Sequence, residues 1–217
     1  MTSMERTWQV LLIGGASGVG KTSVSYRLAQ HCGVSLTEVD DFQIILERMT
    51  SPCQYPVLHY WRTHRREALR MTEAEQLDHT LRYSDVMSKA LEPVIGNHIE
   101  SRTPVVLEGD FILPSLAVRR MYGDVHALGQ VRAVFIYEPD ERQLFENYLA
   151  REGEQQPRRA HMSFLFSEWL RKEASRLGLP TVAARPWNTV LERVTDALTS
   201  QESIKPVDRH QDPSGCR

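Results

Sequence analysis

The chain has 217 residues and a formal net charge of −2, a balance that argues against a nucleic-acid or anionic-membrane partner. No apolar run approaches the roughly 20 residues that span a bilayer, and the N-terminal segment MTSMERTWQV lacks the apolar core of a secretory signal, which predicts a cytoplasmic protein. Cys32, Cys53 and Cys216 are scattered without paired spacing, so structural disulfides and a zinc site are both unexpected.

The first predicted elements are a strand and a helix joined by a glycine-rich turn. Val10 to Ile13 is a short apolar run, and apolar residues at helical spacing follow the turn. The turn matches the phosphate-loop pattern G-x-x-x-x-G-K-[ST]. Its residues are Gly15, Ala16, Ser17, Gly18, Val19, Gly20, Lys21 and Thr22.

The chemistry of phosphate binding explains this pattern. Glycines let consecutive backbone N–H groups point into one concavity, and the helix that begins near Gly20 adds its positive end. Lys21 is expected to reach the β- and γ-phosphates, and the Thr22 hydroxyl to ligate the bridging Mg²⁺. The pattern therefore predicts a nucleoside triphosphate site, with an ordinary glycine turn between strand and helix as the alternative.

A second strand and a helical insert follow. Residues 34–39 are predicted to form a short strand that ends at Asp40, which can also cap a helix over residues 42–49. After a proline-containing loop and a basic, aromatic segment, Thr72 and Glu75 form a capping box that opens a long helix. This predicts a helical insert over about residues 50–102.

Strands and helices then alternate again. Residues 104–107 and 131–137 are continuous apolar runs typical of buried parallel strands, and Asp140 is placed to cap the next helix, with Gln143 three residues on. A charged, polar segment at about residues 151–160 predicts a mobile flap or lid. A helix over residues 161–177, a strand over 179–184 and a helix over 189–198 complete the pattern.

The alternation predicts an α/β fold, namely a three-layer, doubly wound, five-stranded parallel sheet in a single domain of residues 1–200. Residues 201–217 have little to bury and are predicted to be disordered. In such a sheet the ligand site lies beyond the carboxyl ends of the strands.

Acidic residues follow two of these strand ends. Asp40 is our candidate for the carboxylate that accepts or orients a substrate hydroxyl proton, with helix capping as its structural alternative. Asp41 is a candidate for the Mg²⁺ shell through water. Glu108 ends an apolar strand, which favours a role near Mg²⁺ or substrate because an unpaired buried carboxylate is costly. Asp110 either shares that role or forms a turn.

Basic residues supply candidates for charge compensation. Arg151, Arg158 and Arg159 surround the lid, whose closure would bring them to the γ-phosphate, and Arg142 is a further candidate; solvated surface charge is the alternative for each. A basic cluster in the insert would favour an anionic acceptor if it faces the cleft. Its members are His59, Arg62, His64, Arg65 and Arg66.

With these residues, the chain resembles the P-loop kinases of nucleosides, nucleotides, gluconate and antibiotics. The resemblance covers about residues 8–199 and implies ATP as donor, Mg²⁺, an acceptor-binding insert and an arginine-bearing lid. It also implies that the turn after the last strand packs on adenine, which makes Arg185 and Trp187 candidates for that contact. For Trp187, a place in the core is the alternative.

Within that group, the segments GGASGVGKT, VDDFQIILERM and VVLEGDFILPS are similar to 2-phosphoglycerate kinase-like proteins. Asp40 and Glu108 fall on matching positions of that family's pattern. The chain departs from it at Asp110, Phe111 and Ser115, where the family has an apolar residue, His and Gly. Asp40-Asp41-Phe42 also resembles the DDF step of ribosyl-nucleoside kinases, in which the first aspartate acts on the sugar hydroxyl.

The sequence therefore predicts an ATP- and Mg²⁺-dependent kinase acting on a hydroxyl of a 2-phosphoglycerate-like, nucleoside-like or sugar-like acceptor. The catalytic candidates are Lys21, Asp40, Glu108, Arg151 and Arg158. A P-loop ATPase or a nucleotide-binding regulatory protein is the alternative. A regulatory GTPase is set aside because the chain lacks the N-K-x-D motif. The pattern leaves the acceptor and the oligomeric state open.

Overall fold

Five parallel strands form the central sheet of the computed structural model, which describes residues 7–201. They are β1 (Val10–Gly14), β2 (Ser35–Glu38), β3 (Val105–Gly109), β6 (Val131–Tyr137) and β7 (Thr181–Ala183). Their order is β2-β3-β1-β6-β7, and every neighbouring pair is parallel. The segments that follow the strands therefore emerge along one edge of the sheet, with the turn after β1 near its middle.

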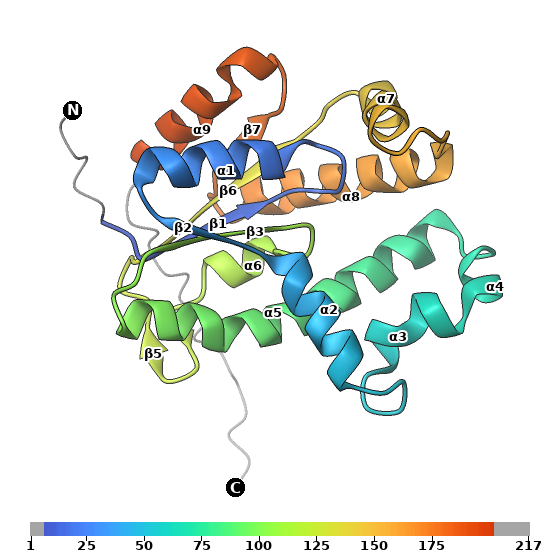
Figure 1. The fold of residues 1–217 in the computed structure, drawn as a ribbon, viewed down its shortest axis with the longest axis horizontal. Coiled ribbons are helices and arrows are strands. Elements are labelled where there is room, and N and C mark those ends of the chain that lie inside the picture. The colour runs from blue at the N-terminus through green and yellow to red at the C-terminus, as the bar shows by residue number, and fades with distance from the viewer. Residues whose placement is uncertain (1–6, 202–217) are drawn as a thin grey trace, which may run out of the picture.

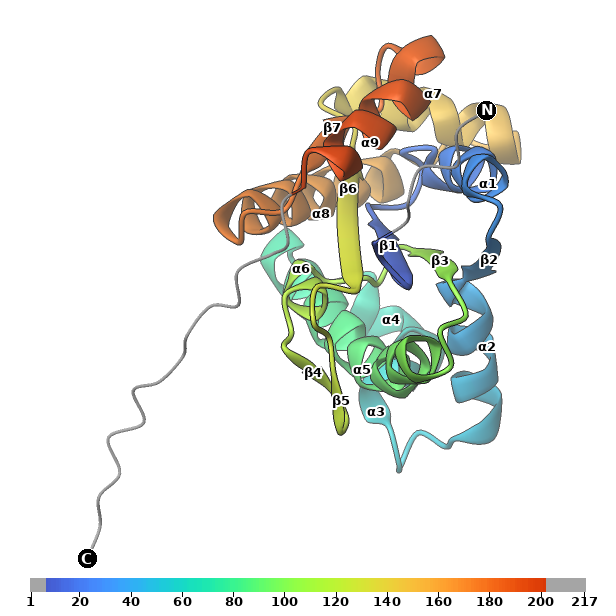
Figure 2. The same ribbon diagram turned by 90° about the vertical axis from the view of Figure 1, so that its left-hand side faces the viewer.

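Helices cover both faces of this sheet (Figure 1). α1 (Lys21–Cys32) and α9 (Val190–Thr199) pack on one face. α5 (Glu73–Glu100), α6 (Pro114–Ala117) and α8 (Pro157–Arg176) cover the other. Figure 2 shows the strands between the two helical layers. The predicted three-layer, doubly wound α/β fold is confirmed.

The insert and the lid extend from this core. α2 (Val39–Met49), α3 (Pro56–Thr63) and α4 (Arg65–Ala68) connect β2 to α5. α7 (Glu141–Glu152) packs on α8, and the 3₁₀ turn η1 (Trp187–Thr189) leads into α9. A short hairpin of β4 (Met121–Tyr122) and β5 (Val125–His126) was not predicted, because strands of two residues carry no detectable periodicity.

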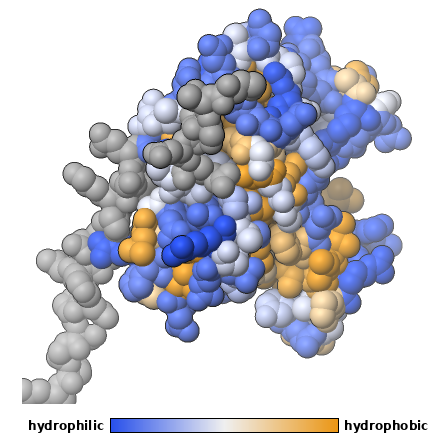
Figure 3. Space-filling view, turned by 60° about the vertical axis from the view of Figure 1, so that its left-hand side comes forward, coloured by the Kyte–Doolittle hydropathy of each residue, from blue (hydrophilic) through white to orange (hydrophobic). Residues whose placement is uncertain are grey.

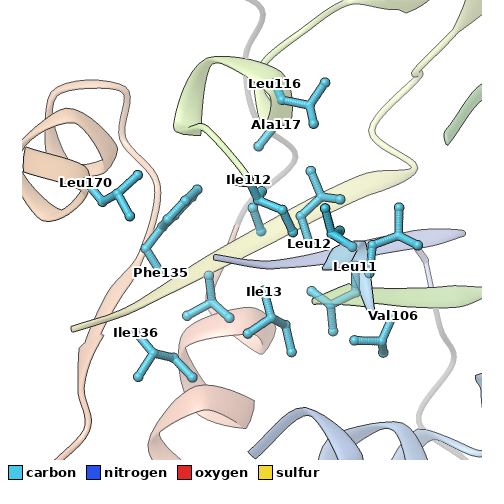
Figure 4. Close-up of a cluster of buried hydrophobic side chains, with 14 of the residues drawn as sticks. Leu11, Leu12, Ile13, Val106, Ile112, Leu116, Ala117, Phe135, Ile136 and Leu170 are labelled. Atoms are coloured by element: carbon cyan, nitrogen blue, oxygen red, sulfur yellow. The ribbon is translucent and has the colours of Figure 1, made fainter. Parts of the chain in front are cut away.

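The core consists of apolar side chains from both faces of the sheet (Figure 4). Leu12 and Phe135 extend to the side of α6 and α8, where Leu170 and Leu116 also lie, whereas Ile13 and Ile136 point to the opposite side. Alternation along each strand explains this division, since successive side chains of a strand point to opposite faces. Buried on both faces, β1 and β3 are apolar almost throughout.

Several predicted helix ends agree with the structure. Gly33, with φ 63°, ends α1, and Thr72 and Glu75 form the reciprocal capping box of α5. The Asp140 side chain caps α7 by accepting a hydrogen bond of 2.9 Å from the Arg142 backbone N–H. Gln143, however, donates to Asn147 one turn later.

One local prediction was wrong, and a second segment has more regular structure than expected. α2 begins at Val39, so Glu38 occupies the cap position and Asp40 lies within the first turn instead of capping the helix. Val39 is fully buried against the sheet, and its apolar character made the helix start look like strand. The predicted flap is largely helical, because α7 continues to Glu152 and α8 begins at Pro157.

The long helix α5 serves two purposes. Its C-terminal half buries Met87, Leu91, Ile95 and Ile99 in the core, whereas its N-terminal half extends beyond the sheet next to α3 and α4. The C-terminal half therefore belongs to the layer that covers the sheet, and only the N-terminal half contributes to the insert.

Hydrophilic side chains dominate the surface seen in Figure 3, with separate apolar patches between them. Ile44, Ile45 and Met49 of α2 are among the exposed apolar side chains.

Within residues 7–201, no helix combines the length and apolar character needed to cross a membrane. Cys32 and Cys53 form no disulfide in this part of the chain, and Cys216 and most of the tail predicted to be disordered lie outside the described residues.

Candidate nucleotide and acceptor site

The phosphate loop connects β1 to α1 at the carboxyl edge of the sheet. Gly18 and Gly20 have φ angles of 84° and 87°, which strain any residue with a Cβ. Gly20 is the N-cap residue of α1, and a Cβ added to it would lie 2.6 Å from the Trp187 ring. Because Ala16 and Val19 bury their side chains, the loop faces a ligand mainly through its backbone, as phosphate binding requires.

Lys21 lies at the centre of a cluster of acidic side chains. Its Nζ contacts the Asp110 carboxylate and lies 3.6 Å from Glu108 Oε1 and 3.4 Å from the Ala16 carbonyl oxygen. The register of β1 and β3 places Gly14 opposite Gly109, which brings the start of α1 to the end of β3. Burial opposes the ammonium charge, but Asp110 and then Glu108 raise the pKa of Lys21, so it stays charged in the cleft.

The neighbouring carboxylates are held at an electrostatic cost. Glu108 is 3% exposed, and its burial raises its pKa against the opposing effects of Lys21 and Thr22. Asp40 is exposed as a residue, and partial desolvation of its carboxyl group and then the charge of Asp110 raise its pKa. Three carboxylates around one ammonium leave an excess of negative charge when all are ionised. Their oxygens and the Thr22 hydroxyl are the kind of donors that Mg²⁺ prefers.

The two adjacent aspartates of α2 differ in their surroundings. The charge of Lys21 acts on Asp40, so this side chain belongs to the cluster around the phosphate loop. Asp41 is exposed, as Asp40 is, but its charge acts on the Tyr26 hydroxyl of α1. Among residues 7–201, no group of three or more His, Cys, Asp or Glu side chains is arranged to hold a metal ion.

A cavity of about 740 Å³ opens beside the phosphate loop, between the insert and the lid. Ser17 and Asp110 contribute to its wall from the phosphate-loop side, and Trp61, Phe111 and Phe166 are among its apolar lining residues. Three arginines also line it: Arg65, Arg158 and Arg159. Part of the predicted basic cluster therefore faces the cavity, since Arg65 belongs to that cluster.

The two histidines of the basic cluster have different surroundings. His59 is buried, with Nε2 3.0 Å from Thr50 Oγ1 and Nδ1 2.8 Å from the Arg62 guanidinium. Because Arg62 can only donate, Nδ1 accepts and Nε2 carries the proton. His59 thus connects α3 to the end of α2. His64 instead stacks on Tyr60, with ring centroids 4.7 Å apart.

Arg158 connects the lid to the insert. Its guanidinium donates to the backbone carbonyl oxygens of Leu69 at 2.5 Å and Met71 at 2.9 Å, and lies 3.4 Å from Gln76 Oε1. His161 makes a second connection, with Nε2 3.0 Å from Glu73 on α5 and Nδ1 2.9 Å from Glu141 on α7. In this arrangement Arg158 holds the wall of the cavity in place.

The other lid arginines are oriented by Glu152 and Tyr148. Arg151 and Arg159 pair with Glu152 at 2.6 and 2.9 Å, and both guanidinium groups lie over the Tyr148 ring. Arg159 also lines the cavity, whereas Arg142 extends into solvent and pairs with Glu146.

The turn after β7 lies on the other side of the phosphate loop. Trp187 is partly buried, its ring lies against Gly20, and the Arg185 guanidinium lies 5.8 Å from the centroid of that ring. Arg185 also lies 3.5 Å from the buried Glu138 and 3.4 Å from Asn147, whose side-chain amide donates to the Gly18 carbonyl oxygen. Asn147 and Glu138 were not predicted from the sequence, because neither belongs to a recognisable motif.

Comparison with known proteins supports the predicted resemblance. No protein-family model matches the chain. It is 30% identical over 115 residues to the 2-phosphoglycerate kinase of Methanococcus vannielii, covering 49% of this chain and 37% of that protein. It is 20% identical over 199 residues to the 2-phosphoglycerate kinase of Methanocaldococcus jannaschii, covering 88% of this chain and 63% of that protein. The chain thus spans less than two thirds of the length of either relative.

Solved structures show the same fold at low identity. A sugar kinase from Janibacter sp. superposes with a TM-score of 0.52 at 18% identity, covering 92% of this chain and 96% of that one. The shikimate kinase of Acinetobacter baumannii has a TM-score of 0.52 at 14% identity, covering 90% and 95%. The chain has the fold of P-loop kinases, and the resemblance predicted from its sequence is confirmed.

Proposed function

We propose that this protein is an ATP-dependent kinase that transfers the γ-phosphoryl group to a hydroxyl of a small-molecule acceptor. One observation carries this proposal: the phosphate loop lies next to a separate cavity that is lined by side chains. Ser17 and Asp110 line that cavity, and Lys21 of the loop contacts Asp110. Phosphoryl transfer needs this adjacency, because its catalysis depends on positioning and charge compensation more than on covalent chemistry.

For the nucleotide, the backbone of residues 15–22 and the N-terminus of α1 would hold the phosphates, with Lys21 as the point charge. Thr22 and Glu108 would hold Mg²⁺, with Asp41 as a further candidate through water; the ion, when bound, neutralises charge on the phosphate oxygens. Arg185 and Trp187 lie where the turn after the last strand approaches the phosphate loop, which supports a role in binding the adenine.

For the acceptor, the arginines of the cavity favour an anionic molecule, because guanidinium groups bind carboxylates and phosphates in a bidentate manner. A compound such as 2-phosphoglycerate carries a hydroxyl, a phosphate and a carboxylate. Its two anionic groups could therefore bind to the arginines of the cavity. Asp40 is our proposed base for the attacking hydroxyl, and Arg151 and Arg159 are proposed to reach the transferring phosphoryl group once a nucleotide is bound. Arg158 shapes the acceptor cavity in this arrangement.

The proposal is tested by mixing the purified chain with Mg²⁺, labelled ATP and a panel of hydroxyl compounds that includes 2-phosphoglycerate. We expect transfer to at least one acceptor, loss of transfer in Lys21→Ala, and reduced turnover with nearly unchanged ATP affinity in Asp40→Asn. ATP hydrolysis that no panel member redirects would favour the ATPase alternative. Absence of magnesium-dependent nucleotide binding would refute the proposal altogether.

A further inference from the structure

Asp110 is the acidic residue that departs from the pattern of the similar kinases, and it occupies a distinctive place in the site. It directly follows β3, and its carboxylate contacts the Lys21 ammonium. Its side chain is 23% exposed, against 4% for that of Glu108. Asp110 can therefore reach both the buried lysine and the open cleft.

The contact matters because Lys21 is the residue expected to bind phosphate oxygens. An ammonium group has three donors, and those of Lys21 face Asp110, Glu108 and the Ala16 carbonyl oxygen. A bound polyphosphate would need the same donors. The Asp110 carboxylate, which is anionic like a phosphate, thus competes with the nucleotide for Lys21.

The cavity provides the second observation. Among the described residues that line it, Asp110 is the one carboxylate, and three arginines line it as well. Asp40 does not belong to this lining. A molecule held by its anionic groups at the arginines would turn its neutral, hydrogen-bond-donating part toward Asp110.

The segment that carries Asp110 is well fixed. Phe111, the next residue, packs against the buried Tyr83 with ring centroids 4.6 Å apart, and Ile112 is fully buried. On the other side, Gly109 packs closely on Val39. A carboxylate on such a rigid segment can orient a ligand precisely enough to affect specificity.

We propose that Asp110 changes its partner when substrates bind: it holds Lys21 in the free protein, and once nucleotide phosphates take that lysine, it accepts a hydrogen bond from a donor group of the acceptor other than the attacking hydroxyl, whose single proton is directed to Asp40. This inference rests on the proposed kinase function. It makes acceptor binding depend on nucleotide binding, because a carboxylate engaged by Lys21 is a poorer partner for a hydrogen-bond donor of the acceptor. By linkage, the acceptor then strengthens nucleotide binding by the same factor.

The test compares wild type with Asp110→Asn, which keeps the shape and removes the charge, and with Asp110→Ser as a second variant. Asp124→Asn, in the exposed turn between β4 and β5, is the control for loss of one negative charge. Calorimetry with Mg²⁺ and a non-hydrolysable ATP analogue measures nucleotide affinity, and thermal unfolding checks that each variant is folded.

Because the competing carboxylate is gone, we expect both Asp110 variants to bind the analogue about tenfold more tightly than wild type, with the control unchanged. With an acceptor found in the panel above, kcat/KM for that acceptor should fall about a hundredfold in Asp110→Asn, and the acceptor should no longer tighten analogue binding. Analogue affinity within twofold of wild type, in a folded variant, would overturn the inference. If neither wild type nor any variant binds the analogue, the kinase proposal fails as well. Failure of the inference alone is thus distinguished from failure of the proposed function.

Discussion

The contact between β3 and the start of α2 allows the geometry of the site to be tested by adding one methyl group. Gly109 ends β3, and a Cβ at this position would lie 2.5 Å from Val39 Cβ and 3.2 and 3.3 Å from its two γ-carbons. Val39 is fully buried and directly precedes Asp40. Gly109→Ala should therefore push the first turn of α2, and with it Asp40, away from the sheet.

The size of the effect follows from these distances. Carbon atoms pack at about 3.5–4.0 Å, so the two backbones must separate by about 1 Å. Inserting a methyl group into a well-packed core costs about 1–3 kcal/mol. Replacing glycine also restricts the unfolded chain, and this offsets about 0.4–1 kcal/mol of the packing cost. The free energy of unfolding should fall by about 1–2 kcal/mol, while a shift of about 1 Å at Asp40 should lower turnover about a hundredfold.

The assay combines urea unfolding with kcat measured on an acceptor from the panel. Gly33→Ala is the matched control, because Gly33 has φ 63° and no atom within 4 Å of a Cβ, so it should lose about 1 kcal/mol through backbone strain alone. Gly33 lies at the end of α1 remote from the phosphate loop, and this variant should keep its kcat. Equal kcat in Gly109→Ala and wild type, or equal losses in both variants, would refute the reasoning.

Two further predictions concern the connection between lid and insert. Arg158→Ala removes the hydrogen bonds to the carbonyl oxygens of Leu69 and Met71, so KM for the acceptor should rise about tenfold while KM for ATP stays unchanged; a parallel change in both constants would contradict this. The pKa of His161 is raised, chiefly by Glu141. Its stabilisation is thus complete below the ordinary histidine pKa of about 6.5 and lost as pH rises through the higher folded value. Because His161 is partly exposed, the effect should stay below about 1 kcal/mol, and His161→Gln should abolish this part of the pH dependence of Tm.

The sequence alone predicted the features that depend on local patterns. The apolar runs of β1, β3 and β6 identified the buried strands, since a strand covered on both faces must be apolar on both. The glycines and Lys21 identified the phosphate loop, because its backbone conformation requires particular residues at fixed spacing. Strand and helix alternation then determined the fold class.

Only the tertiary structure decided which side chains of different elements come into contact. Lys21 and Asp110 are 89 positions apart, and their contact depends on the register of β1 with β3. Arg158 could be assigned to the lid from the sequence, but its partners lie on the insert, and no spacing in the chain encodes that approach. Patterns of neighbouring residues report local conformation, whereas the partner of a charged side chain is set by which elements pack together, and that is decided only when the whole chain is folded.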